Sequence, residues 1–282
     1  MILKAPGKIN LALDVINKRD DGYHNIDTVS IPIALHDCLE ITELIQGNET
    51  YLTCDDLSLV CDESNLAIQA YRAMQENFGL KRPFRIEIYK RIPIEAGLAG
   101  GSADAAAVMR AVSRYLKPVP TFDRLAAVGA AVGSDVPFCL LNKPSRVQGR
   151  GEILTPVSVK KAYHVLLVKP RQGLSTEEVY AVADGKTVRH PDIEALIDAL
   201  KIGDEPKIAA NLINSLEEAA ISLCPAVADI LGQFKLLGFR MYSMSGSGSA
   251  CFALAEDVRL LQYSAKFFAS KGYKTYLTSF NI

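Results

Sequence analysis

Hydrophobic residues follow two different spacings along this chain. In some stretches they alternate with polar residues, as in Ile9–Val15 and Phe84–Tyr89, and in others they return every three or four residues, as in Leu66–Phe78. Alternation is typical of half-buried β-strands, and the wider spacing is typical of amphipathic helices. In the first half these patterns predict strands over residues 9–15, 26–35, 38–44, 51–54, 84–89 and 151–155. They predict helices over residues 66–78, 105–116 and 122–132.

Residues that begin or end helices border these three segments. The pair Ser64–Asn65 can cap the first helix and Gly79 can end it, while Pro118 stops the second. Thr121 can cap the third helix, and Gly133 can end it. The helix predictions therefore have local support at both ends.

The second half mixes both patterns. A continuous apolar run at 163–168 predicts a buried strand, and Ser175 with Glu178 forms a capping box that starts a helix at Thr176. Further helices are expected at 191–200, 205–223, 225–237 and 258–270, and further strands at 240–244, 250–254 and 273–280. This order predicts an α+β unit with helices on one face of an antiparallel sheet. We place a domain boundary near Pro156, between residues 1–157 and 158–282.

A glycine-rich stretch lies between the strand at 84–89 and the helix at 105–116. Its glycines, Gly97, Gly100 and Gly101, allow close approach of the backbone to a ligand, and the first helical turn offers N–H donors to an anion. Ser102 can cap the helix, or its hydroxyl can face a phosphate or a metal. No lysine follows the glycines, so this is not the nucleotide loop that ends in Gly-Lys-Ser/Thr. The structural alternative is a tight turn before an ordinary helix.

Three other positions carry candidate chemistry. Lys8 and Asn10 share one face of the first strand, where they can hold a substrate hydroxyl or form an exposed polar face. Tyr23 and His24 follow a turn and are most simply a polar surface loop. Asp135 lies between a helix end and a proline, where it can cap the next turn or serve as a base or charge partner for Lys8.

Composition narrows the class of protein. The 282 residues include 31 basic and 32 acidic ones, a balance that argues against binding polyanions as the main task. The six cysteines form no Cys-x-x-Cys or zinc pattern, so we expect buried thiols in a reducing cytoplasm. No apolar run reaches the ~18 residues of a membrane span. We expect no secretory signal, because no basic segment followed by an apolar run starts the chain.

Three separated segments resemble one family. The stretch 93–107 resembles the Pro-x-x-x-Gly-Leu-Gly/Ala-Gly-Ser-Ser/Ala-Asp/Asn-Ala-Ala motif of the GHMP kinases, which phosphorylate small alcohols. Lys8 with its strand, and the run 245–249, occupy the matching places before and after it. The resemblance implies an N-terminal domain like ribosomal protein S5 domain 2, a ferredoxin-like C-terminal domain, and use of ATP with Mg²⁺.

A finer resemblance points to one branch of that family. The segments 5–11, 19–24, 133–138 and 149–154 are similar to kinases that act on the 2-hydroxyl of a cytidylylated sugar alcohol in the nonmevalonate route to isoprenoids. Asp-Gly-Tyr-His within 19–24 is the specific element. One departure is the run 141–146, where the family often has a Gly-Gly-Thr-Ala-like turn; the role of Lys143 there stays open.

The resemblance also assigns roles residue by residue. It implies that Lys8 and Asp135 are the catalytic pair and that Ser102 is a protein contact to Mg²⁺. It implies that ATP binds Pro93, Ile94, Glu95, Ala96, Gly97, Leu98, Ala99, Gly100, Gly101, Ser102, Ala103 and Asp104. It implies that the substrate binds Asn10, Tyr23, His24, Thr176, Tyr180, Ser245, Gly246 and Ser247.

Two competing hypotheses remain at this point. One is a kinase for another small alcohol, such as homoserine or mevalonate, against which Asp-Gly-Tyr-His argues. The other is a non-catalytic binding module, which would not need both Lys8 and Asp135. We expect a cytoplasmic monomer or weak homodimer whose partners are ATP and a small molecule, with no nucleic acid or membrane partner.

Overall fold

The computed structural model describes residues 1–282 except residues 46, 48, 186 and 187. The chain packs into two compact units. The first unit comprises Met1–Gly7, Leu35–Pro93 and Ala99–Asn142, and the second comprises Lys8–Ala34, Ile94–Leu98 and Lys143–Ile282. The glycine-rich stretch therefore contributes residues to both units. The domain boundary at residues 157/158 stays a prediction.

Two long strands run through both units. Strand β1 (Ile2–Lys18) pairs with β2 (His24–Glu43), and β2 replaces the two strands expected at 26–35 and 38–44, so that prediction was wrong. Asp37 lies between the two expected strands; it is fully buried, and its carboxylate accepts hydrogen bonds from the backbone N–H groups of Arg91 and Ile92. With its acceptor satisfied, the strand continues through it.

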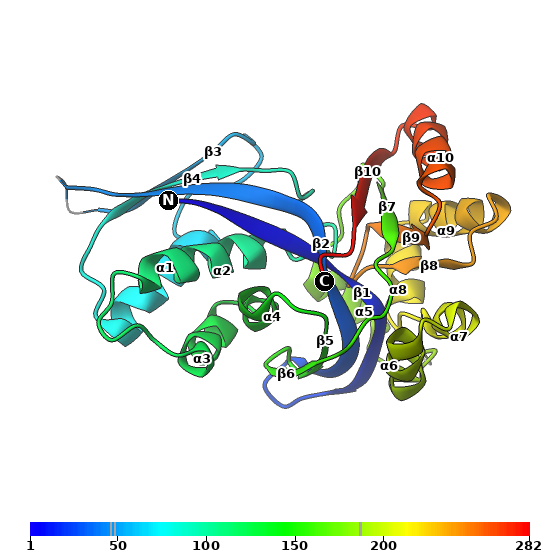
Figure 1. Ribbon diagram of the computed structural model, residues 1–282, viewed down its shortest axis with the longest axis horizontal. Helices are drawn as coiled ribbons and strands as arrows, with labels where there is room; N and C mark the ends of the chain where they lie inside the picture. The colour runs from blue at the N-terminus through cyan, green and yellow to red at the C-terminus, as the bar shows by residue number, and fades with distance from the viewer. Residues whose placement is uncertain (46, 48, 186–187) are drawn as a thin grey trace. The chain divides into compact units, whose positions relative to one another are not determined.

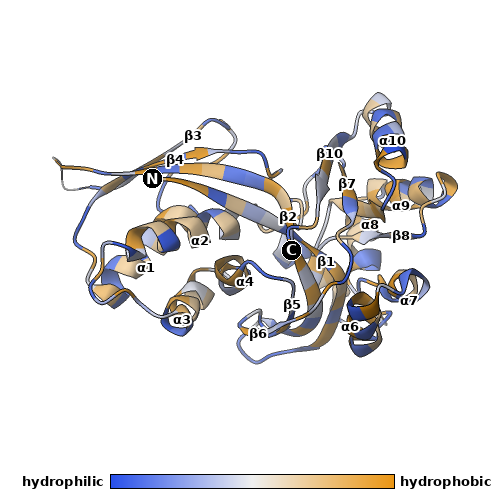
Figure 2. Ribbon diagram, viewed as in Figure 1, coloured by the Kyte–Doolittle hydropathy of each residue, from blue (hydrophilic) through white to orange (hydrophobic). Residues whose placement is uncertain are grey.

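The first unit is a sheet covered by helices. Strand β4 (Phe84–Tyr89) pairs antiparallel with the second half of β2, and β3 (Tyr51–Cys54) pairs parallel with β4. The helices lie together on one side of these strands (Figure 1). They are α1 (Leu66–Phe78), α2 (Gly100–Ser113), α3 (Phe122–Val132) and α4 (Val136–Leu141). Helix α2 is hydrophobic along most of its length and is largely buried (Figure 2).

The helix-end predictions were partly right. Asn65 caps α1 by accepting from the N–H of Ala67, and Gly79 ends it in the left-handed region, as predicted. Thr121 precedes α3 but makes no side-chain cap. Helix α2 starts earlier than predicted, after Ala99 at φ 58°, with no side-chain cap. Ser102 lies inside α2, which excludes one of its two possible roles, that of capping this helix; its contact with a phosphate or a metal stays a prediction.

The second unit is α+β, with an antiparallel sheet in the order β10-β7-β9-β8. These strands are β7 (His164–Lys169), β8 (Met241–Met244), β9 (Cys251–Ala255) and β10 (Lys274–Ser279). Its helices are α5 (Thr176–Ala183), α6 (Ile193–Ile202), α7 (Glu205–Asn211), α8 (Glu217–Leu223), α9 (Ala226–Leu236) and α10 (Val258–Ser270). Side chains of β7, β9, α5, α8, α9 and α10 share one hydrophobic core.

Two more strands complete this unit. Strand β5 (Ser145–Gly149) pairs antiparallel with the first half of β2 and with β6 (Ile153–Pro156). The sequence patterns missed β5, and the strand predicted at 151–155 starts two residues before β6 starts and ends one residue before β6 ends. Residues 141–146, which depart from the family's usual turn, form the end of α4, a left-handed residue at Asn142 (φ 50°) and the start of β5.

The single helix expected at 205–223 is wrong, because α7 and α8 are separate. Asn214 lies in the break, and its amide donates to the carbonyl oxygens of Met244 (2.9 Å) and Gly246 (2.8 Å). Its own side-chain oxygen accepts from the N–H of Leu216. The break between α7 and α8 therefore places Asn214 where its side chain holds the turn that follows β8.

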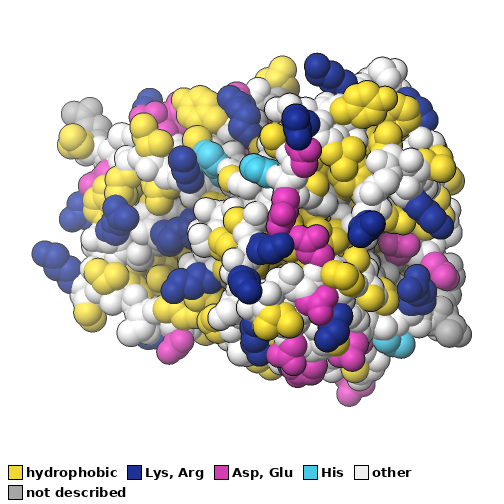
Figure 3. All heavy atoms as spheres, turned by 45° about the vertical axis from the view of Figure 1, so that its right-hand side comes forward, with side chains coloured by type: hydrophobic (Ala, Val, Ile, Leu, Met, Phe, Trp, Pro, Cys, Tyr) yellow, Lys and Arg dark blue, Asp and Glu magenta, His cyan; other side chains and the backbone are white. Residues whose placement is uncertain are grey.

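The surface and the cysteines add two points. On the face shown in Figure 3, basic and acidic side chains lie among one another and among hydrophobic ones. The cysteines are free thiols, and Cys139, Cys224 and Cys251 are buried as expected, but Cys61 is exposed. Among the described residues, no single helix has the length and hydropathy of a membrane span; only the bent pair α8 and α9, at 119°, passes that test together.

Candidate active site

Lys8 and Asn10 lie on β1 in the second unit, and both side chains are buried. Their exposed fractions are 4% and 3%, which rules out the interpretation of an exposed polar strand face. The ammonium of Lys8 donates to Oδ1 of Asn10 (2.6 Å) and to the carbonyl oxygen of Gly97 (3.3 Å). The amide of Asn10 in turn donates to the hydroxyls of Thr28 and Ser30. These hydrogen bonds help to hold a buried cation in one position.

Gly97 is the point where the glycine-rich stretch meets the end of the chain. Its φ of +70° favours glycine, and a Cβ there would lie 2.0 Å from the carbonyl oxygen of Ser245. The hydroxyl of Ser245 donates to the carbonyl oxygen of Gly97 (3.0 Å), and the N–H of Lys8 donates to that of Leu98 (3.1 Å). Four predicted residues from three separate segments therefore come together: Lys8, Asn10, Gly97 and Ser245.

The turn after β8 also brings in α5. Gly246 has φ +57°, and a Cβ there would lie 2.9 Å from the carbonyl oxygen of Gly97. The hydroxyls of Ser247 and Thr176 lie 2.9 Å apart, and Thr176 is the first residue of α5. Ser175 caps this helix by accepting from the N–H of Glu178, as the sequence predicted. The predicted substrate residues Thr176 and Ser247 are thus direct neighbours.

The aromatic residues form a different arrangement from a simple surface loop. The rings of His24 and Tyr180 lie 4.7 Å apart between centres, tilted by 35°. Nε2 of His24 lies 2.7 Å from Oδ1 of Asp184, a residue that sequence analysis missed. Hydrogen bonds from Lys18 and then His24 lower the pKa of Asp184 below its usual range.

Tyr23 is 52% exposed, and the Arg150 guanidinium lies 4.6 Å from its ring centre.

Asp135 lies in the first unit, at the residue before α4. It occupies the N-cap position but makes no side-chain capping bond, which removes the purely structural alternative of a helix cap. Its residue is half-buried, and Pro137 follows in the first turn of the helix. The Asp135 carboxylate is therefore not the cap of α4.

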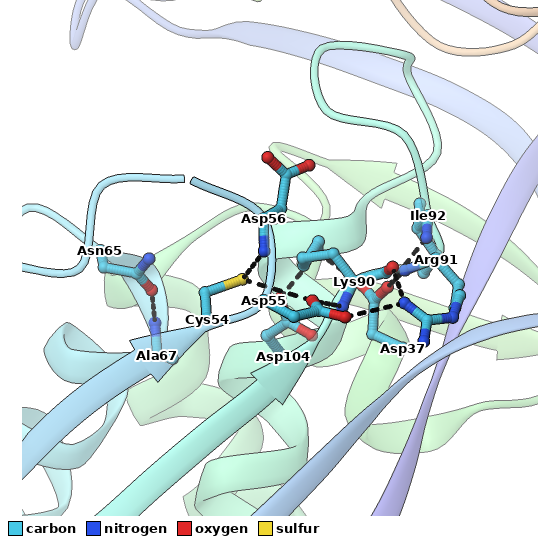
Figure 4. A network of polar contacts seen from close by, with 10 residues as sticks. All are labelled: Asp37, Cys54, Asp55, Asp56, Asn65, Ala67, Lys90, Arg91, Ile92 and Asp104. Atoms are coloured by element: carbon cyan, nitrogen blue, oxygen red, sulfur yellow. Dashed lines mark hydrogen bonds and ion pairs between the residues drawn. The ribbon is translucent and has the colours of Figure 1, made fainter. Parts of the chain in front are cut away.

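The start of α2 rests on a buried ion cluster, shown in Figure 4. Oδ2 of Asp104 lies 2.9 Å from Nζ of Lys90, and the same ammonium lies 2.5 Å from Oδ2 of Asp37. Asp104 is 2% exposed, and its carboxylate faces Lys90. The assignment of Asp104 to the ATP-binding stretch stays a prediction. Lys90 was missed, although its place between the strand and Pro93 was a usable signal.

The charges in this cluster shift one another's protonation. Burial raises the pKa of Asp104 to about 7, and Lys90 only partly offsets that effect. Burial also lowers the pKa of Lys90, but Asp104 and Asp37 outweigh it and raise the pKa above its usual value. Within the described residues, no group of three or more His, Cys, Asp or Glu could hold a metal ion.

The comparisons with known proteins agree on one family. The profile described as GHMP kinases N terminal domain matches residues 65–143, and GHMP kinases C terminal matches residues 188–266. A 4-diphosphocytidyl-2-C-methyl-D-erythritol kinase of Bacillus velezensis is 42% identical over 253 residues, covering 90% of this chain and 87% of that protein. This chain belongs to the GHMP kinase family. A kinase of the same name from Geobacillus kaustophilus is 40% identical, covering 92% of this chain and 90% of that protein.

Solved structures give the same assignment for the fold. A crystal structure of 4-(cytidine 5'-diphospho)-2C-methyl-D-erythritol kinase has a TM-score of 0.81 and 32% identity, covering 99% of this chain and 98% of that one. Homoserine kinase from Cytophaga hutchinsonii has a TM-score of 0.75 at 18% identity, covering 98% of this chain and 94% of that one, and shows the shared fold alone. The predicted two-domain α+β kinase fold is confirmed, and this GHMP kinase is a small-molecule kinase.

Proposed function

We propose that this kinase transfers the γ-phosphoryl group of ATP to the 2-hydroxyl of 4-diphosphocytidyl-2-C-methyl-D-erythritol, a step of the nonmevalonate route to isoprenoids. The observation that carries this proposal is the identity of about 40% over nine tenths of the chain to kinases of that name. The cluster of Lys8, Asn10, Gly97 and Ser245 supports it, because it assembles the family's separate motifs in one place.

The chemical step is assigned to two residues. Asp135 orients the substrate hydroxyl and accepts its proton as the new oxygen–phosphorus bond forms. Lys8 stabilises the negative charge on the reacting oxygens with its buried ammonium, which Asn10 and Gly97 hold in place. Phosphoryl transfer depends mainly on positioning and charge stabilisation, so a fixed ammonium and a carboxylate suffice as protein groups.

The nucleotide side is assigned to the stretch 93–104. The left-handed backbone at Glu95, Gly97 and Ala99 and the uncapped start of α2 leave N–H groups for phosphate oxygens. Mg²⁺ fits this site as an ion held mostly by phosphates and water, with Ser102 as the proposed protein contact, because no carboxylate cage is present among the described residues. When bound, Mg²⁺ would neutralise charge on the phosphates.

The acceptor side is assigned to groups of the second unit. Asn10, Thr176 and the turn Ser245-Gly246-Ser247 offer polar atoms for the sugar alcohol and its phosphates. Tyr23, His24 and Tyr180 are proposed to hold the cytosine, since aromatic faces and a ring nitrogen suit a flat base with polar edges. The contact between the rings of Tyr180 and His24 places both side chains at the same part of the proposed acceptor site.

The test is ATP turnover with and without the proposed acceptor. We expect ADP formation to depend on 4-diphosphocytidyl-2-C-methyl-D-erythritol, and product NMR to place the new phosphate on the 2-hydroxyl. Homoserine and mevalonate serve as controls, because proteins acting on them share the fold at low identity. Equal turnover with either control alcohol, or none with the cytidylylated one, would contradict the proposal.

A further inference from the structure

Helix α2 begins without any side chain that fixes its first turn. Its N-cap residue Ala99 has a left-handed φ of 58° and makes no side-chain cap, and Gly100 and Gly101 are its first two residues. Glycine is a poor helix former, so these two residues add little to the stability of the first turn. Some other contact must hold this turn where phosphate is proposed to bind.

The contact that holds it comes from below the helix, through Asp104. This residue is the fifth of α2, is 2% exposed, and lies 2.9 Å from Nζ of Lys90. Gly100 lies close to the same lysine, since a Cβ added at Gly100 would lie 3.3 Å from Lys90 Nζ and 3.1 Å from Ile92. The side chain of Lys90 therefore lies next to the first turn and contacts the carboxylate that directly follows that turn.

Lys90 is itself fixed by two contacts besides that with Asp104 (Figure 4). Its ammonium lies 2.5 Å from Oδ2 of Asp37 in the middle of β2, and its backbone N–H donates to Oδ1 of Asp55 over 2.7 Å. The other oxygen of Asp37 accepts from the N–H groups of Arg91 (2.5 Å) and Ile92 (2.8 Å). A rigid connection thus runs from β2 through one ammonium to the start of α2.

The net charge of Lys90, Asp37 and Asp104 affects how well an anion binds at the start of α2. One ammonium faces two buried carboxylates, so the cluster is negative when both are ionised and neutral when one holds a proton. Oδ1 of Asp104 is buried without a hydrogen-bond partner, an environment that disfavours an ionised carboxylate. A neutral Asp104 anchors the helix without repelling an anion at the helix N-terminus.

We propose that Lys90 and Asp104 are positioning residues for the nucleotide: through their buried contact they hold the first turn of α2 in the geometry that binds phosphate. This inference rests on the proposed function, since it concerns the same ATP-binding stretch. It differs from direct binding, because neither side chain needs to touch the nucleotide.

The decisive experiment compares Asp104→Ala with Asp104→Asn, using ADP binding by calorimetry and steady-state kinetics. The alanine loses the anchor, so we expect the Kd for ADP and the KM for ATP to rise at least ~10-fold, as for a misplaced binding group, with the KM for the acceptor unchanged. The asparagine keeps an oxygen for Lys90, so we expect it to restore ADP affinity to within about threefold of wild type. Glu43→Gln, which neutralises a half-buried partner of Arg82 on the same strand as Asp37, is the matched control.

A second measurement decides the matter even where Asp104→Ala does not fold. Wild-type ADP affinity should fall from pH 6 to pH 8 as Asp104 loses its proton, by about threefold more than in Asp104→Asn, which has no proton to lose. Unchanged ADP affinity in folded Asp104→Ala, or identical pH profiles for wild type and Asp104→Asn, would overturn the positioning role. Failure of wild type itself to bind ADP or turn over ATP would instead overturn the proposed function.

Discussion

The hydroxyl of Ser245 donates a hydrogen bond of 3.0 Å to the carbonyl oxygen of Gly97, and this bond joins residues 148 positions apart in the chain. The same carbonyl oxygen accepts from the ammonium of Lys8. One backbone oxygen thus sets the glycine-rich stretch, the proposed catalytic lysine and the serine-glycine turn relative to one another. Changes at Gly97 should disturb all three together.

Gly97→Ala tests how tight this junction is. The new Cβ would lie 2.0 Å from the carbonyl oxygen of Ser245, and alanine is strained at φ +70°. We expect a lower Tm and a loss of kcat/KM of at least ~10²-fold in the folded variant. The control is Gly232→Ala in α9, where nothing lies within 4 Å and φ is not left-handed. It should stabilise the protein by about 0.5–1 kcal/mol with normal activity, and equal behaviour of the two variants would contradict the prediction.

Asp135→Asn tests the proposed base. The amide keeps the shape of the side chain but cannot accept the substrate proton, so kcat should fall at least ~10²-fold with ATP affinity little changed. Asp123→Asn, an exposed carboxylate in the first turn of α3, is the matched control and should retain wild-type kcat. Near-wild-type kcat in purified, folded Asp135→Asn would remove this residue from catalysis.

Tyr180→Ala tests the acceptor site. If the ring holds the cytosine as well as contacting His24, its loss should raise the KM for the cytidylylated substrate by roughly 5- to 150-fold, corresponding to about 1–3 kcal/mol of stacking. ATP affinity should stay the same. The aromatic control is Tyr263→Ala on α10, because Tyr263 is 65% exposed. A drop in Tm with no change in the acceptor KM would mean that Tyr180 only supports His24.

The stability of the first unit should depend on pH through Asp104. Its pKa is raised to about 7 in the folded protein from 3.8, so between these pH values the folded state holds a proton that the unfolded state releases. Stability contributed by this group is therefore lost as pH rises from about 4 to 7, with a slope of at most ~1.4 kcal/mol per pH unit. Denaturant unfolding of wild type and Asp104→Asn across this range checks it: wild type should lose stability relative to the variant, and parallel curves would contradict the prediction.

Local patterns predicted the elements whose ends depend on neighbouring residues. Asn65 and Ser175 cap α1 and α5 as expected, because a capping side chain reaches only two or three residues along its own helix. The strand at 84–89 and the helix at 258–270 were also placed correctly, since their faces are set by spacing alone. The motif at 93–107, with Asp-Gly-Tyr-His at 21–24, was enough to assign the kinase family.

What failed depended on partners far away in the chain. Asp37 does not interrupt β2, because groups of Lys90, Arg91 and Ile92 donate hydrogen bonds to its carboxylate. Asn214 lies where the predicted helix is interrupted, and its side chain donates to the backbone of Met244 and Gly246. Spacing cannot reveal such contacts, since burial and hydrogen bonding are settled only when distant segments meet.

The sequence by itself determined the family, the separate motifs and most of the helices and strands, because these follow from residue type and spacing. Only the tertiary structure decided that Lys8 and Asn10 are buried, that Gly97 meets Ser245, and that Asp104 turns to Lys90. The physical reason is that charge and burial act through space. In the stretch proposed to bind ATP, the carboxylate of Asp104 can anchor α2 because the ammonium of Lys90, which directly follows β4, lies 2.9 Å away.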